Sequence, residues 1–116
     1  MPIWGIDLGG TKIEGVVLSD EKVPKMLVRK RVDTEAARGY QHIISRIKLL
    51  IGTMAHELGY FTEKIGLGTP GAIDPISSLM KNANTTVLNG RYFKADVKKA
   101  LASLYKWRQL FCFGRI

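Results

Sequence analysis

The chain has 116 residues, of which 46% are hydrophobic, and its mean hydropathy is zero. This length allows one domain that buries, on folding, roughly two-thirds of the surface of the unfolded chain. No apolar run approaches the ~20 residues of a membrane span, and the N-terminus lacks the basic and apolar segments of a secretion signal, so we expect a cytoplasmic protein.

The net charge of +8 has two possible explanations. The 18 Lys and Arg residues, with Arg29-Lys30-Arg31 as a local run, would suit a nucleic-acid surface. However, the other basic residues are spread over every segment, and the sequence shows neither a helix-turn-helix pattern nor a group of aromatic residues for base stacking. Nucleic-acid binding is therefore the less favoured explanation, and part of the charge would suit contact with an acidic second domain.

Two apolar runs near the N-terminus predict a β-hairpin. The runs Ile3 to Leu8 and Ile13 to Leu18 alternate in character and are rich in β-branched residues. Gly9-Gly10 between them predicts the turn, because both positions accept a positive φ without a Cβ clash.

The residues around this turn carry more chemistry than a hairpin needs. Asp7 lies at the end of the first run, just before Leu8, and Thr11 and Lys12 come directly before the second run. Glycines allow backbone N–H groups to approach an anion closely, so Asp7 would face a magnesium ion while Thr11 and Lys12 reach phosphate oxygens. The spacing of a Walker loop is absent. An ordinary hairpin turn without a ligand remains the alternative.

A third strand and a long helix are expected next. Met26 to Val32 predicts a strand that is antiparallel to the second and lies at an exposed sheet edge. The helix is expected to open at Asp33-Thr34-Glu35, with Asp33 or Thr34 as N-cap, and to end at Gly59 after about 24 residues. The apolar residues spaced for its buried face are Ala37, Tyr40, Ile43, Ile44, Ile47, Leu50, Ile51, Met54, Ala55 and Leu58.

The remaining elements would complete a mixed sheet. Lys64 to Gly68 predicts a fourth strand, which a right-handed crossover places parallel to the first. The loop Thr69-Pro70-Gly71 then lies at the same end of the sheet as the turn from Asp7 to Lys12, where ligands of open α/β sheets bind. A second helix is expected from Phe93, and Leu110 to Phe113 would add a fifth strand at the edge.

Two blocks, in the same order, resemble the ROK family of bacterial sugar kinases and repressors. Asp7 to Lys12 resembles the first phosphate motif of the sugar kinase, actin and heat-shock chaperone superfamily. Gly66 to Pro75, followed by Lys81 to Thr85, resembles the ROK sugar-site segment. The resemblance extends from Ile3 to Leu101. It implies an α/β fold of the ribonuclease H-like, actin-like ATPase class, with an antiparallel three-strand start followed by parallel strands and packed helices.

The resemblance also implies ligands. It implies ATP with Mg2+ at the turn, and a hexose or N-acetylhexosamine at the second block, where amide side chains suit sugar hydroxyls because they both donate and accept hydrogen bonds. The residues implied for ATP are Asp7, Gly9, Gly10, Thr11 and Lys12, with Asp7 also facing the metal. The residues implied for the sugar are Gly71, Asn82, Asn84 and Thr85.

The chain departs from the family pattern at two places. Ile76 to Leu79 occupies a turn in which the family usually has a glycine. After Leu101, family kinases continue to an Asn-Asp-Ala-Asn motif whose aspartate is the general base, whereas this chain has no aspartate after Asp96. We therefore expect residues 1–116 to form a single N-terminal domain of a truncated ROK kinase, with residues 102–116 outside the family pattern.

Such a domain is expected to be inactive alone, because phosphoryl transfer needs several parts at once. Two alternatives stay open: a sugar- or nucleotide-sensing module that acts through a partner, and a basic nucleic-acid-binding domain. In each case we expect self-association through the apolar surface on which a second domain would dock.

Overall fold

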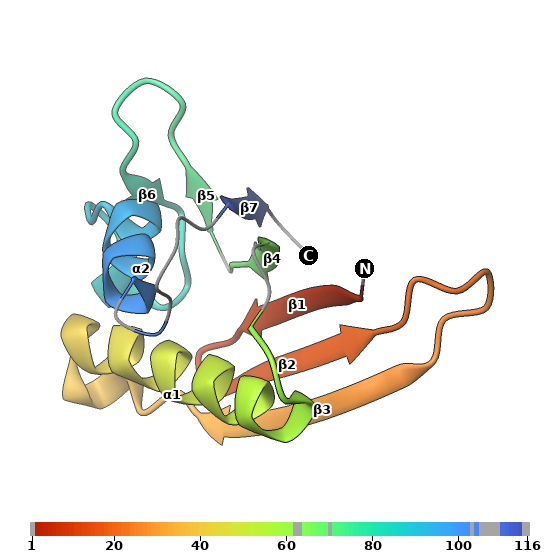
Figure 1. The fold of residues 1–116 in the computed structure, drawn as a ribbon. Coiled ribbons are helices and arrows are strands. Elements are labelled where there is room, and N and C mark those ends of the chain that lie inside the picture. Colours follow the sequence, from red (N-terminus) through yellow and green to blue (C-terminus); the bar gives the residue numbers. More distant parts are fainter. Residues whose placement is uncertain (1, 62–63, 70, 103, 105–109, 115–116) are drawn as a thin grey trace.

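The computed structural model describes residues 2–61, 64–69, 71–102 and 104, and the backbone of residues 110–114. It contains a five-stranded mixed sheet in the order β3-β2-β1-β4-β7, a two-stranded sheet of β5 and β6, and two α-helices (Figure 1). The strands are β1 (Ile3–Leu8), β2 (Lys12–Leu18), β3 (Met26–Asp33), β4 (Lys64–Gly68), β5 (Ala72–Ile73), β6 (Met80–Lys81) and β7 (Leu110–Gly114). The helices are α1 (Tyr40–Leu58) and α2 (Phe93–Leu101), with 3-10 turns η1 (Ala36–Arg38) and η2 (Thr86–Leu88).

The first three strands form the antiparallel start that the sequence predicts. β1 pairs with β2 from Ile3↔Leu18 to Leu8↔Ile13, so the connection is the short turn that contains Gly9 and Gly10. β2 pairs antiparallel with β3, which lies at the edge of the sheet. The predicted hairpin and edge strand are therefore confirmed.

The parallel half of the sheet also agrees with the prediction. β4 pairs parallel with β1, with Asp7 opposite Gly68, and β7 pairs parallel with β4 on the far edge. The predicted α/β class, with an antiparallel start followed by parallel strands, is therefore confirmed. No helix among the described residues is long and apolar enough to cross a membrane.

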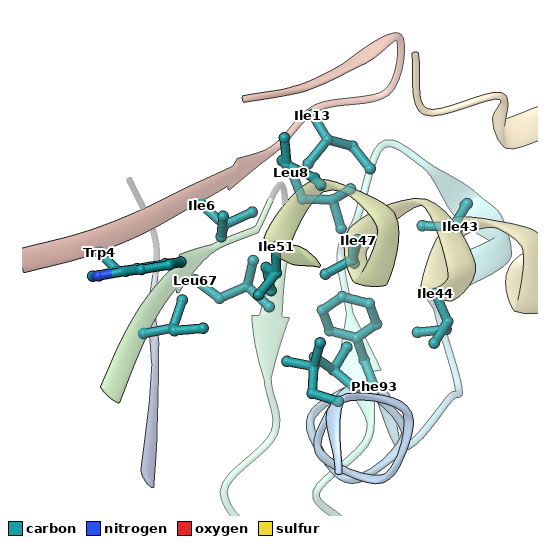
Figure 2. Packing of buried hydrophobic residues seen from close by; sticks show 14 of the residues in the cluster. Trp4, Ile6, Leu8, Ile13, Ile43, Ile44, Ile47, Ile51, Leu67 and Phe93 are labelled. Carbon is teal, nitrogen blue, oxygen red and sulfur yellow. The ribbon is translucent and has the colours of Figure 1, made fainter. Parts of the chain in front are cut away.

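The core lies between one face of the sheet and α1, with α2 packed on α1 (Figure 1). Along β1, Trp4, Ile6 and Leu8 are buried, whereas Ile3 and Asp7 are exposed on the other face, as the two-residue period of a strand requires. Figure 2 shows these strand residues in one cluster with the isoleucines of α1 and Phe93 of α2. The side chains of the opposite face include Asp7, which places that carboxylate outside the core.

The helix begins later than the sequence predicts. Asp33 ends β3 instead of capping a helix, and Glu35 has a left-handed backbone with a φ of 54°. The short turn η1 follows, and Gly39, with a φ of 103°, separates it from α1. The predicted opening at Asp33 to Glu35 is therefore wrong, and the observed helix has 19 residues.

The predicted buried face of the helix is largely confirmed. From Tyr40 to Ala55 every predicted apolar position is buried, and Leu58 is half-buried. Ala37 is exposed because it lies in the 3-10 turn, outside the periodicity of α1. The predicted C-terminal residue is also confirmed: Gly59 has a φ of 95°, and its N–H donates to the carbonyl oxygen of Ala55.

Two glycines of this region should respond to alanine in opposite directions. Gly59→Ala is expected to lower the free energy of unfolding by about 1 to 2 kcal/mol, because a Cβ is strained in the left-handed region. Gly52→Ala, inside the helix with open space around the added carbon, is expected to raise it by up to about 1 kcal/mol. Urea unfolding followed by circular dichroism checks both. The same sign for the two variants would contradict this account of the helix end.

Candidate functional site

The glycine turn is the first part of the candidate site, and we define it as residues 9–12. The N–H of Gly9 donates to the carbonyl oxygen of Lys12 at 3.0 Å, which closes the turn. Within the part of the chain that the structure describes, the N–H groups of Gly10 and Thr11 have no hydrogen-bond partner. Gly10, Thr11 and Lys12 are exposed. The turn therefore offers two free backbone donors at the surface, which is what an anion site needs.

The last residue of β3, Asp33, and the next residue, Thr34, hold this turn, and sequence reasoning did not assign them to the site. The Thr34 hydroxyl donates to the Gly9 carbonyl oxygen at 2.8 Å, and the Thr34 N–H donates to the Thr11 carbonyl oxygen at 2.8 Å. Asp33 pairs with the Lys12 ammonium, which lowers the pKa of the Asp33 carboxyl. Thr34 and Asp33 were expected to cap a helix, and their contacts with a turn more than 20 residues earlier leave no local signal in the sequence.

Asp7 lies beside the turn, at the carboxyl end of β1. Its neighbours in the sheet are Glu14 on β2 and Gly68 on β4, and its side chain is on the exposed face. Gly68 has no side chain, so it places none beside the carboxylate. No group of three or more His, Cys, Asp or Glu residues suited to a metal occurs among the described residues, so a cation at Asp7 would need ligand oxygens or water to complete its coordination.

The second predicted block meets the glycine turn through Thr85. A Cβ atom at Gly10 would lie 3.2 Å from Oγ1 of Thr85, so the missing side chain allows the two segments to approach. Asn82 and Asn84 are exposed, and Asn82 has a left-handed backbone with a φ of 58°. The structure thus brings Gly10 and Thr85 together, although they are far apart in the sequence.

Asn89 holds the backbone of this second block. Its Oδ1 accepts from the Ala83 N–H at 2.9 Å, and its Nδ2 donates to the Ala83 carbonyl oxygen at 3.1 Å. Ala83 is buried, which leaves the flanking Asn82 and Asn84 at the surface. Asn89 was not among the site residues predicted from the sequence. From the sequence alone, an asparagine that bonds both the N–H and the carbonyl oxygen of a residue six positions earlier cannot be distinguished from an ordinary turn asparagine.

Gly71 serves a close approach of two backbone segments. A Cβ atom there would lie 2.5 Å from the carbonyl oxygen of Lys81 and 2.9 Å from the N atom of Ala83. Thr69 begins this loop, and its hydroxyl donates to the Gly71 carbonyl oxygen at 3.0 Å. Gly71 therefore packs directly on Lys81 of β6 and on Ala83 after that strand. In the hairpin that β5 and β6 form, Ser78 has a positive φ of 65°. Ser78 lies in the turn where the family pattern usually has a glycine.

The basic run of β3 has Arg29 and Arg31 on the sheet face that carries Asp7 and Lys30 on the face of α1, and all three are paired. Arg29 and Arg31 both contact the carboxylate of Glu14 on β2, with the Arg31 Nη2 at 2.7 Å. These contacts lower the pKa of Glu14, chiefly through the hydrogen bond from Arg31. Lys30 is 3.1 Å from Glu57 at the end of α1. The run is therefore engaged in ion pairs within the domain, which weakens its case as a nucleic-acid surface.

The helices behind the site are joined by a polar contact. The Tyr40 hydroxyl donates to Asp96 Oδ2 at 2.6 Å, and the Arg91 guanidinium lies 4.7 Å from the centroid of the Tyr40 ring. Burial, with the Asp96 hydrogen bond and charge adding to it, raises the pKa of Tyr40 above its ordinary range.

A surface groove of about 490 Å3 lies along α1 and is lined by Leu49, His56 and other residues. It contains none of the predicted site residues.

The sequence matches a known protein family over most of its length. The family model described as "ROK family" matches residues 3–106. No curated protein matches the chain.

Several solved structures share the fold. A ROK hexokinase from Thermus thermophilus is 23% identical with a TM-score of 0.74, and the match covers 99% of this chain and 35% of that one. A ROK family glucokinase from Streptomyces griseus, solved with glucose and AMPPNP, is 20% identical with a TM-score of 0.76, over 99% and 33% of the two chains. A putative N-acetylmannosamine kinase from Listeria monocytogenes is 17% identical with a TM-score of 0.57, over 97% and 35%. This chain thus spans about a third of their length.

Proposed function

Because the chain belongs to the ROK family, we propose that its 116 residues are the N-terminal, actin-like domain of an ATP-dependent sugar kinase. The observation that supports this best is the close approach of Gly10 to Thr85, where a Cβ atom added to Gly10 would lie 3.2 Å from the Thr85 Oγ1 atom. This approach joins the predicted phosphate turn to the predicted sugar segment. A kinase must bring its two substrates to one place, since phosphoryl transfer depends on positioning them.

The nucleotide would bind at the glycine turn. The free N–H groups of Gly10 and Thr11 fit phosphate oxygens, and the exposed carboxylate of Asp7 fits Mg2+, which is usually held by one or two carboxylates together with phosphates and water. Gly9 shapes the turn, and Lys12 would reach a phosphate by leaving its ion pair with Asp33. Bound Mg2+ would supply positive charge to the phosphates.

The sugar would bind at the second block. Exposed Asn82 and Asn84 offer amide groups for hydroxyls, Thr85 offers a hydroxyl next to the turn, and Gly71 would contribute through its backbone. We propose a hexose or an N-acetylhexosamine, because the similar structures include a glucokinase and a putative N-acetylmannosamine kinase.

We propose that these residues bind ligands without transferring phosphate by themselves. The carboxylates of Glu14 and Asp33 beside the glycine turn accept hydrogen bonds from Arg31 and Lys12 that lower their pKa, which makes them poor bases for the proton of a sugar hydroxyl. Exposed apolar residues on the sheet, Ile3, Met26 and Leu27, would support contact with a further domain or a second copy.

Calorimetric titration with Mg-ATP, and separately with a panel of hexoses, tests this proposal. We expect Asp7→Ala to weaken Mg-ATP binding at least about tenfold, or about 1.4 kcal/mol, and to leave sugar binding unchanged. Asn84→Ala should weaken sugar binding and leave Mg-ATP binding unchanged, so each variant is the control of the other. Asp20→Ala, an exposed carboxylate in the β2–β3 connection, should change neither. A folded wild-type chain that binds neither ligand would reject the proposal.

A further inference from the structure

We infer that Thr34 is a positioning residue that orients the peptide groups of the glycine turn toward an anion, an inference that rests on the proposed nucleotide site. Thr34 is fully buried, with 0% of its surface exposed, and it is the buried polar residue of the described part of the core. Its hydroxyl and its N–H donate to the carbonyl oxygens of Gly9 and Thr11, each at 2.8 Å.

These two hydrogen bonds determine where the turn's own donors point. In a planar trans peptide the C=O and the following N–H point in opposite directions. The Gly9 carbonyl faces Thr34, so the Gly10 N–H points away from Thr34. The Thr11 carbonyl is held by the Thr34 N–H, which fixes the other end of the turn. One threonine thus fixes the first and the last peptide of the glycine turn and directs the Gly10 N–H away from itself.

The support behind Thr34 makes this orientation rigid. Arg46 of α1 donates from Nε to the carbonyl oxygen of Asp33 at 2.9 Å, which fixes the peptide that joins Asp33 to Thr34. The turn is therefore tied through Thr34 to the helix that fills the core. A donor set that is oriented before the ligand arrives binds more tightly, because less ordering remains to be done on binding.

The substitution Thr34→Val removes the hydroxyl and keeps the shape and the backbone N–H, whereas Thr34→Ser keeps the hydroxyl. We expect Thr34→Val to speed amide hydrogen exchange at Gly9 about fivefold to tenfold, because the turn loses one hydrogen bond. Its affinity for Mg-ATP should fall by a similar factor. Thr34→Ser should restore both. Thr53→Val, which removes a hydroxyl that bonds the Leu49 carbonyl oxygen on α1, should change neither.

The exchange rate needs no ligand, so the two proposals can fail separately. If the wild-type chain does not bind Mg-ATP, the proposed function fails, and faster Gly9 exchange in Thr34→Val alone still supports the role of Thr34 in holding the turn. Unchanged exchange in Thr34→Val, measured on a variant whose amide spectrum is folded, would overturn the inference. So would a Thr34→Ser variant as impaired as Thr34→Val in both measurements.

Discussion

Replacing Phe93 with alanine is expected to lower the free energy of unfolding by about 3 to 5 kcal/mol. Phe93 is the first residue of α2, and its side chain is completely buried. Its ring meets the Tyr40 ring edge-on, with centroids 6.5 Å apart, and Figure 2 shows it pointing toward Ile47 of α1. Removing the ring would leave a cavity at the contact between the two helices. Since domains are stable by about 5 to 15 kcal/mol, a large fraction of the stability would be lost.

Urea unfolding followed by circular dichroism measures this loss. Tyr92→Ala is the matched control, because Tyr92 is the preceding aromatic residue and 57% of its surface is exposed, so its replacement should cost no more than about 0.5 kcal/mol. Phe93→Leu keeps most of the volume and should lie between the two. Equal losses for Phe93→Ala and Tyr92→Ala would mean that α2 does not pack on α1 as described.

The parts of the fold that follow from local rules could be read from the sequence. β1 and β2 bury alternate residues because a strand presents two faces, and this period is visible in Ile3 to Leu18. The end of α1 was readable from Gly59, because glycine accepts the left-handed backbone that closes a helix. The parallel pairing of β4 with β1 followed from the order strand, helix, strand.

The parts that depend on distant contacts could not be read in this way. Thr34 before Glu35 is typical of a helix N-terminus, but its hydroxyl instead bonds Gly9, 25 residues earlier. Gly39 lies inside the predicted helix, but its φ of 103° separates α1 from the preceding 3-10 turn. In both cases a tertiary arrangement overrode a local preference.

The candidate site could be predicted in composition but not in geometry. Sequence reasoning placed the glycine turn and the loop Thr69-Pro70-Gly71 at one end of the sheet, and the structure adds the approach of Gly10 to Thr85. Ligand binding by these residues stays a prediction. The partners that hold them, Thr34 and Asn89, became apparent only once the chain was folded, because their signal is a hydrogen bond and not a motif.

Gly71→Ala is expected to disturb both stability and the sugar segment. The added carbon would meet the Lys81 carbonyl oxygen at 2.5 Å and the Ala83 backbone at 2.9 and 3.0 Å, and backbone atoms cannot turn aside as a flexible side chain can. Either β6 or the loop after β4 must therefore move. We expect a loss of about 2 to 3 kcal/mol in the free energy of unfolding, as for other overpacked sites, with displaced amide resonances from Asn82 to Thr85.

Gly66→Ala is the control that separates crowding from a general effect of replacing glycine. Gly66 lies in β4, where the added carbon would be 3.6 Å from the Trp4 carbonyl oxygen, an ordinary contact. This variant should be as stable as the wild type or up to about 1 kcal/mol more stable, since glycine weakens a strand interior. If Gly71→Ala behaves like Gly66→Ala, then the loop after β4 does not pack on residues 81–83, and the sugar segment must be positioned by other contacts, such as those of Asn89.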